Sequence, residues 1–170
     1  KTSIGMKKII LMLLAITTSF IGNAQEKIMD FQLSGYKAVF IPSDTFFIKI
    51  GHPELGNIEK SKGVLSLTLK DSQGKMPKDT VWIYTDQIRH INLNFSEIDM
   101  NKPFDVDSLS ISTTSSHGFI HVKANYLKVL AKAGSHLNVK GKTNYFKCQR
   151  IGYSSINTDE LQTASVQEVE

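Results

Sequence analysis

The chain has 170 residues, 41% of them hydrophobic and 21% charged, which is enough apolar content for one domain with a continuous core and excludes a disordered chain or a large modular enzyme. Its 11 glycines and 4 prolines exclude a collagen-like or low-complexity sequence. Its single cysteine, Cys148, excludes an internal disulfide framework and a cysteine-cluster zinc site. Stability must therefore come from packing and from backbone pairing.

The segment 1–24 has the pattern of a secretory signal peptide. Lys7 and Lys8 follow Met6, an apolar run occupies most of 9–21, and small residues precede the expected cleavage point after Ala24. Residues 1–5 then lie upstream of Met6, the expected initiator. The apolar run is short for a membrane span, although an uncleaved anchor helix is the alternative interpretation.

Removal of this segment changes the charge of the protein. Three lysines and no acidic residue lie in 1–24, so the remaining chain has 17 basic and 16 acidic residues and a net charge of +1. The whole-chain pI of about 9.1 therefore gives no general argument for nucleic-acid binding. We expect an exported protein, periplasmic, on the outer surface or secreted, with no nucleic-acid partner and no transmembrane span after cleavage.

After the signal segment, apolar and polar residues alternate almost throughout, and this period of two predicts β-strands with one buried face. No later window has a sustained helical stripe with caps. The first strands are expected at 31–40, 45–50, 63–70 and 80–84, as hairpins that open and cap the fold. The sequence therefore predicts an all-β protein.

An internal repeat organises the C-terminal half. Two sets of doublets recur along it, where a doublet is a pair of mostly apolar residues separated by one polar residue. The steps from each doublet to the next are similar but unequal. The first set begins at Ile98, Ile120, Leu137 and Ile156, and the second at Leu109, Leu127, Phe146 and Leu161. Gly118, Gly134 and Gly152 precede the last three units and are expected at corners with positive φ.

A repeat of this kind, with glycine at the corner, predicts a β-solenoid, in which short strands pair with the coils before and after them. The fold class we expect is thus an all-β, parallel β-helix-like solenoid with an N-terminal hairpin cap, and residues 25–170 form a single domain. The doublets of each set would form one inward file. Because the steps are unequal, an antiparallel β-sandwich is the alternative.

Several phrases resemble the putative auto-transporter adhesin, head GIN-domain family. The segment 31–39, FQLSGYKAV, is similar to the opening strand of that family, and 62–70, KGVLSLTLK, to its element with alternating leucines. Residues 81–91 resemble its strand before the coils. The segments 107–112, 125–129 and 133–139 resemble its repeated coils. The resemblance extends over about 31–170, although the repeated Ser-Gly-Ala-Ser turn is degraded here and the usual closing phrase is absent.

The resemblance implies a secreted or envelope β-solenoid that acts as a non-enzymatic, adhesin-head-like interaction domain. It carries no catalytic residues to transfer, and we expect no cofactor and no metal. Among the five histidines, His117 and His121 would lie about 13 Å apart on one strand. His121 and His136 could approach each other on adjacent coils, but neither spacing is typical of a metal site.

A glycan-active enzyme on a β-helical scaffold is the alternative function. Asp99, Asp105 and Asp107 occur close together, and paired carboxylates can perform acid–base chemistry or bind calcium. No phosphate-binding loop, serine nucleophile motif or dinucleotide fingerprint accompanies them. Cys148 alternates with polar neighbours at an inward position, which favours a buried thiol over a nucleophile.

The most distinctive electrostatic feature is a run without acidic residues. Residues 118–150 contain no Asp or Glu, and they are expected to form a basic outward face that binds an acidic glycan or another cell-surface component. The basic residues are Lys123, Lys128, Lys132, Lys140, Lys142, Lys147 and Arg150. The structural alternative is that these lysines only protect strand edges. Tyr126, Tyr145 and Tyr153 could stack on sugars near this face, while the oligomeric state is left open.

Overall fold

The computed structural model describes residues 27–70 and 79–169, so the expected signal segment 1–24 lies outside the described residues. The described residues contain twelve β-strands and one short 3-10 helix. None of their helices is long and apolar enough to cross a membrane. The all-β prediction is therefore confirmed.

The strands differ in length between the two halves of the chain. The N-terminal elements are short: β1 (Asp30–Ser34), β2 (Tyr36–Pro42), β3 (Phe47–Ile50), η1 (Pro53–Leu55), β4 (Gly56–Ser61), β5 (Val64–Leu69), β6 (Asp79–Thr85), β7 (His90–Asn94) and β8 (Glu97–Asp99). The C-terminal strands are long: β9 (Phe104–Thr114), β10 (His117–Lys132), β11 (His136–Ile151) and β12 (Ser155–Val169).

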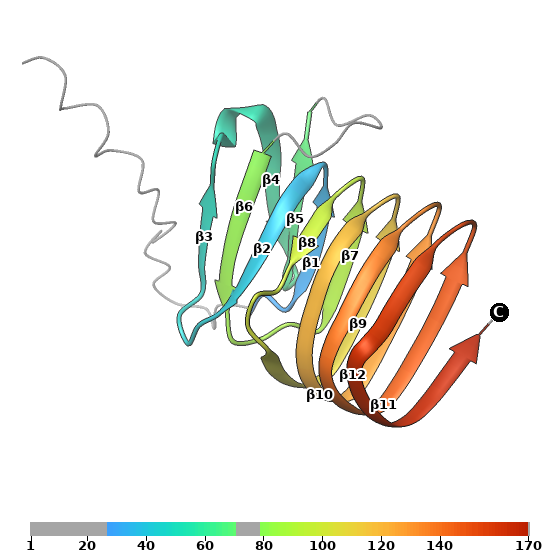
Figure 1. Cartoon of the computed structure of the whole chain (residues 1–170). Coiled ribbons are helices and arrows are strands. Elements are labelled where there is room, and N and C mark those ends of the chain that lie inside the picture. The colour runs from blue at the N-terminus through green and yellow to red at the C-terminus, as the bar shows by residue number, and fades with distance from the viewer. Residues whose placement is uncertain (1–26, 71–78, 170) are drawn as a thin grey trace, which may run out of the picture.

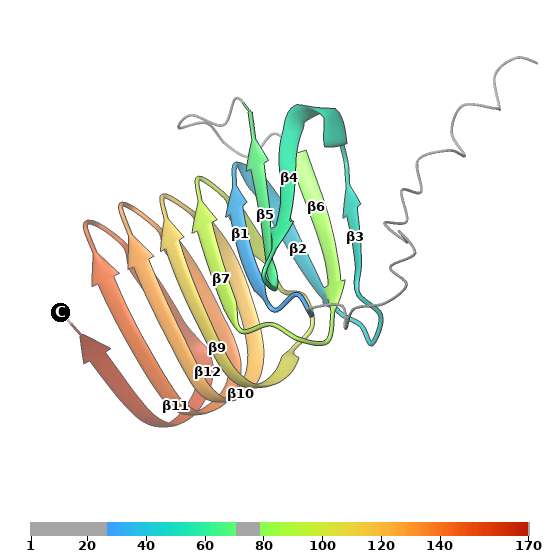
Figure 2. The ribbon, with the colours of Figure 1, turned by 180° about the vertical axis from the view of Figure 1, so that it is seen from behind.

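All strands belong to one sheet that curls into two facing arms (Figures 1 and 2). Each long strand runs along one arm, bends, and continues along the other. The bend falls where the strand pairing skips a residue, at Asp107, Asn125, Asn144 and Ala164. We call the part before the bend, together with β2, β6 and β8, the first arm. The part after it, together with β1, β5 and β7, is the second arm.

Almost all neighbouring strands are parallel. The two antiparallel pairs in the described residues, β3 with β6 and β4 with β5, lie at the N-terminal edge of each arm. Parallel pairing between β9, β10, β11 and β12 excludes the alternative of an antiparallel sandwich. From β9 onward each strand lies beside the one before it in the chain, so that Leu109 is opposite Leu127 and Leu127 is opposite Phe146.

The N-terminal half follows a different order. Strands β1 and β2 lie between the later strands β5 and β6 on one side and β7 and β8 on the other. The predicted strand 31–40 is broken at Gly35, whose φ of 81° turns the chain from one arm to the other. The hairpin β4–β5 forms part of the expected cap, but β4 falls in a segment for which the alternation predicts no strand.

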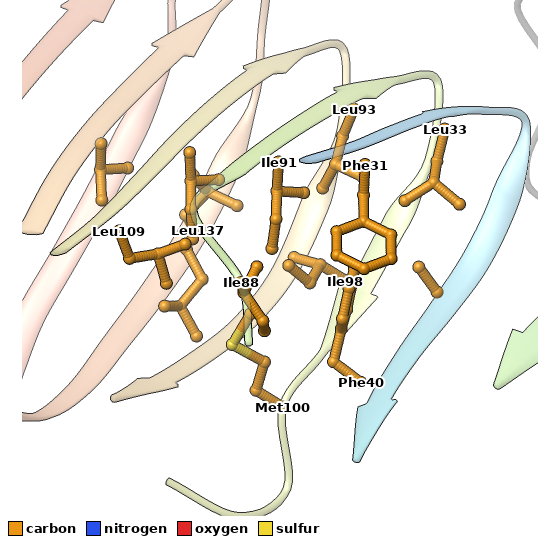
Figure 3. Close-up of a cluster of buried hydrophobic side chains, with 14 of the residues drawn as sticks. Phe31, Leu33, Phe40, Ile88, Ile91, Leu93, Ile98, Met100, Leu109 and Leu137 are labelled. Carbon is orange, nitrogen blue, oxygen red and sulfur yellow. The ribbon is translucent and has the colours of Figure 1, made fainter. Parts of the chain in front are cut away.

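The hydrophobic core fills the space between the arms. Figure 3 shows side chains from both arms pointing into this space, among them Phe31 and Ile91 from the second arm and Phe40 and Ile98 from the first. Phe31 and Phe40 meet edge to face, with ring centroids 5.3 Å apart. Because most inward residues are apolar, the period of two in the sequence becomes a buried lining on both arms.

The inward file expected from the second set of doublets is present with one correction. Leu109, Leu127 and Phe146 lie in register and are buried. The fourth member is Val166, whereas Leu161 lies opposite Gly141. Val166, and not Ser165, lies opposite Phe146 because the register of β12 shifts by one residue between Asn138 and Lys140.

The first inward file also differs from the prediction. Ile98 lies opposite Gly118, which in turn lies opposite Leu137, while Ile120 is two residues further along and pairs with Val139. Gly118 is thus an inward residue of β10 and not a corner. A Cβ atom there would lie 1.9 Å from the carbonyl oxygen of Ile98, so only glycine fits at this close approach.

The turns that join the second arm to the next first arm carry a ladder of serines. Ser96, Ser116 and Ser135 are buried, and the series continues to Ser154. The backbone N–H of Ser116 donates to Ser135 Oγ at 3.2 Å, and the N–H of Ser135 donates to Ser154 Oγ at 3.1 Å. Each serine therefore satisfies a buried donor of the preceding turn and fixes the register of successive strands.

Candidate ligand-binding surface

The seven basic residues of the predicted face do not lie on one surface. Lys123, Lys140 and Lys142 project from the outer side of the first arm, where their neighbours Val122 and Ala124 are buried. Lys128, Lys132 and Lys147 project from the outer side of the second arm. Since the arms face each other across the core, the outer sides point in different directions, and the positive charge is divided between them.

Arg150 belongs to neither outer side. It lies opposite the buried Ala131, at an inward position. Its guanidinium contacts the Glu168 carboxylate of β12 at 2.8 Å, and both side chains remain substantially exposed. Arg150 is thus part of an ion pair near the end of the stack.

Both outer sides carry lysines placed directly opposite each other. Lys123 pairs in register with Lys142 on the first arm, and Lys128 pairs with Lys147 on the second. Like charges in this position repel each other. On the first arm the repulsion is partly offset, because Lys123 Nζ lies 2.6 Å from Asp105 Oδ2.

A polar ladder runs along the bend, between the two arms. The side-chain amide of Asn125 donates to Asp107 Oδ1, and the amide of Asn144 donates to Asn125 Oδ1 at 2.8 Å. The outer positions of three successive strands therefore form one chain of hydrogen bonds. This ladder was not predicted, although Asn125 and Asn144 recur at the same spacing as Leu127 and Phe146 of the second doublet set.

Two tyrosines follow the ladder at the start of the second arm. Tyr126 and Tyr145 lie in register and stack, with ring centroids 5.3 Å apart and an interplanar angle of 9°. The Tyr145 hydroxyl also donates to Gln167 Oε1 at 2.7 Å. Tyr153 is fully exposed at a turn and is not part of this pair. We call the three adjacent rows Lys123 and Lys142, Asn125 and Asn144, and Tyr126 and Tyr145 the bend surface.

The bend surface adjoins a shallow hollow of about 510 Å³ on the first-arm side. Its polar lining consists of Asp105, Asp107, Lys123, Asn125, Lys142 and Asn144. Both carboxylates in it are already engaged, Asp105 by Lys123 and Asp107 by Asn125.

The three carboxylates considered for catalysis do not gather at one point. Asp99 lies opposite Phe119 on β10, whereas Asp105 lies opposite Lys123, four residues further along. Asp105 and Asp107 share the hollow, but Asp99 does not line it. Within residues 27–70 and 79–169 no group of three or more His, Cys, Asp or Glu side chains could hold a metal ion.

The histidines are arranged differently from the expected approach of His121 to His136. His136 lies opposite His117, and His121 lies opposite Lys140. Cys148 is buried on the inward side as predicted, and burial raises the pKa of its thiol. A thiol in this state is a packing group and a poor nucleophile.

Comparison with known proteins gives one family match. A family model described as "Putative auto-transporter adhesin, head GIN domain" matches residues 42–168. No curated protein matches the chain.

Several solved structures are similar in fold. A putative adhesin from Bacteroides fragilis NCTC 9343 superposes with a TM-score of 0.70 at 13% identity, covering 85% of this chain and 72% of that chain. A putative adhesin from Parabacteroides distasonis ATCC 8503 gives a TM-score of 0.58 at 13% identity, with coverages of 87% and 75%. A putative lipid binding protein from the same strain gives 0.57 at 11% identity, with coverages of 84% and 75%. At these identities the likeness shows the fold alone.

Proposed function

Because the chain belongs to the family described as putative auto-transporter adhesin, head GIN domain, we propose that it is a non-enzymatic interaction domain of the cell envelope or cell surface that binds an acidic glycan. Residues 25–170 form this domain after export and cleavage of the signal segment. The strands from β9 onward are coils of a β-solenoid, and the ligand binds on their outer side at the bend surface.

The main support for this proposal is that the three rows of the bend surface, one of lysines, one of asparagines and one of tyrosines, lie side by side. A tyrosine presents an apolar ring with a polar edge, an asparagine offers both donors and an acceptor, and a lysine supplies positive charge. An acidic sugar chain has apolar ring faces, hydroxyl groups and negative charges that match these three kinds of contact. Since each row repeats on β10 and β11, a chain molecule lying across these strands meets the same set of groups twice.

The rigidity of the surface supports the same conclusion. Tyr126 and Tyr145 are held by mutual stacking, and Asn125 and Asn144 by the ladder of hydrogen bonds that ends on Asp107. Groups that are already ordered lose little conformational entropy when a ligand binds.

A glycan array with the purified protein tests the proposal. We expect binding to acidic glycans that weakens as the salt rises from about 50 to about 300 mM, because salt screens exposed charges. The double variant Tyr126→Ala/Tyr145→Ala should lose at least tenfold in affinity. The control Tyr153→Asn removes the fully exposed tyrosine at a turn and should bind as the unmodified protein does. An array without any bound glycan, or equal loss in the variant and the control, would contradict the proposal.

A further inference from the structure

A second hollow lies on the outer side of the first arm, beside the bend surface, and begins at a gap in the sheet. Strand β8 ends at Asp99 and β9 begins at Phe104. Their pairings with β10 cover 117–119 and 122 onward, so Ile120 and His121 have no strand partner on this side. The segment 101–103 between the two strands is exposed.

An irregularity bounds the hollow on the opposite side. Strand β11 contains Gly141, with a φ of 110°, and a Cβ atom there would lie 2.0 Å from the Val122 carbonyl oxygen. The register between β11 and β12 shifts next to this glycine, between Asn138 and Lys140. The gap and the shift together leave a hollow of about 450 Å³. We call it the first-arm hollow.

Positive charge dominates the lining of the first-arm hollow. Lys123, Lys140 and Lys142 line it together with His121, and its one carboxylate is that of Glu160. From the register, His121 is opposite Lys140, and Lys123 is opposite Lys142. The four side chains therefore rise from the corners of a rectangle of about 5 by 7 Å, the spacing of neighbouring strands and of alternate residues.

Several of these groups lack a partner within the part of the chain that the structure describes. Lys140 and Lys142 have no carboxylate within 4.0 Å, although Glu160 lies opposite Lys140. The His121 Nδ1 atom is buried and has no hydrogen-bond partner. Several like charges at close range disfavour the empty site.

We propose that the first-arm hollow binds a phosphate ester group carried by the glycan ligand, which makes this inference dependent on the proposed function. A phosphate ester carries a charge between about −1.5 and −2 and has three strong acceptor oxygens. Lys140 and Lys142 neutralise that charge and donate hydrogen bonds to its oxygens. A glycan lying on the bend surface reaches the hollow because Lys123 and Lys142 border both.

The second arm provides a matched control for the test. Lys128 and Lys147 also lie opposite each other on β10 and β11, but they line neither hollow. The variants Lys140→Gln/Lys142→Gln and Lys128→Gln/Lys147→Gln remove the same charge from the protein. Equal unfolding midpoints of the two variants will establish that both retain the fold.

The experiment is a titration of the ¹⁵N-labelled protein with glucose 6-phosphate, with glucose and with inorganic phosphate, near physiological ionic strength. We expect glucose 6-phosphate to shift the amide signals of Val122 and Gly141 and the ring nitrogen signals of His121, and glucose to shift none of them. Lys140→Gln/Lys142→Gln should weaken this binding at least tenfold, and Lys128→Gln/Lys147→Gln less than twofold. Inorganic phosphate should cause the same shifts at a higher concentration.

Other outcomes separate the two proposals. If both variants weaken binding equally, attraction is non-specific and the first-arm hollow is not a site. If the array shows glycan binding but these signals do not move, the hollow is excluded and the proposed function stands. If the signals move but no glycan binds, phosphate ester binding at the first-arm hollow is supported and the proposed function fails. Tighter binding to vesicles with phosphatidic acid than to glucose 6-phosphate would overturn the assignment to a saccharide.

Discussion

Strands β10 and β12 both contribute to the inward file, but of the two only β10 has a strand on each side. In the inward file Leu127 is 0% exposed on β10, whereas Val166 is 53% exposed on β12. In the serine ladder Ser116 and Ser135, in the turns before β10 and β11, are buried, but Ser154, in the turn before β12, is partly exposed. One coil therefore cannot bury its own apolar residues, and stability in this fold comes from contact between neighbouring coils.

The largest difference between the two strands should appear in the inward file. Leu127→Ala removes buried methyl groups between Leu109 and Phe146 and should lower the free energy of unfolding by about 2–5 kcal/mol. Val166→Ala at the end of the same file should cost about 0.5 kcal/mol or less. Urea denaturation of both variants measures the difference. Similar losses in both would mean that the file is not a continuous packed column.

A smaller difference is expected in the serine ladder. Ser135→Ala leaves the Ser116 backbone N–H without its acceptor, while the Lys132 carbonyl keeps two backbone donors, so the substitution should cost about 1–3 kcal/mol. Ser154→Ala should cost less, because water reaches its turn and can replace the lost bond. Thermal unfolding measures both values. An equal cost would show that burial of the turn does not determine the strength of the ladder.

The smallest difference in stability is expected between two ion pairs, that of Asp30 on β1 and that of Glu168 on β12, as the pH falls. Hydrogen bonds from Arg89, and secondarily from His90, lower the pKa of Asp30, which lies between two strands on the second arm. A carboxyl with a lowered pKa stabilises the fold above the unfolded-state value near 4, and this contribution disappears as the pH falls through the folded-state pKa. The free energy of unfolding of the unmodified protein should therefore fall between about pH 4 and pH 2.

Two variants isolate this contribution. Asp30→Asn should lower stability at pH 7 and flatten the loss in acid. Glu168→Gln removes the exposed partner of Arg150 at the end of the stack and should change stability less. Urea denaturation at pH 7, 4 and 2.5 gives the three values for each protein. An acid profile of Asp30→Asn that matches the unmodified protein would exclude Asp30 as the titrating group.

The alternation of apolar and polar residues was sufficient to predict most of the strands, although not β4, and most of the second inward file. The alternation failed to place the first inward file correctly, because one of the inward positions is a glycine. Gly118 occupies the inward position between Ile98 and Leu137. Because glycine has no apolar side chain, the prediction placed the β10 member of the first file two residues later, at Ile120. Val166 was missed because Leu161 is the larger apolar residue, although the step from Phe146 to Val166 is closer in length to the earlier steps.

The candidate site was predicted only in composition. The sequence shows that 118–150 is basic, but the bend at Asn125 and Asn144 decides which lysines share a side. The residue pattern marks the bend only by a break in the alternation, because the buried Ala124 and Leu127 are three positions apart. The first-arm hollow depends on the gap between β8 and β9, which the alternation does not reveal. The order of β1 and β2 within the sheet likewise depends on contacts between segments far apart in the chain, which periodicity does not contain.

The parallel stacking of β9 to β12 in chain order also determines how the protein responds to mechanical force. Tension applied at residue 169 acts first on β12, whose hydrogen bonds to β11 would break one after another while the rest of the sheet stays intact. Each coil that peels away lengthens the chain by roughly 60 Å, the extended length of its residues. A domain of this kind would yield to load in successive small extensions and would not rupture in a single event.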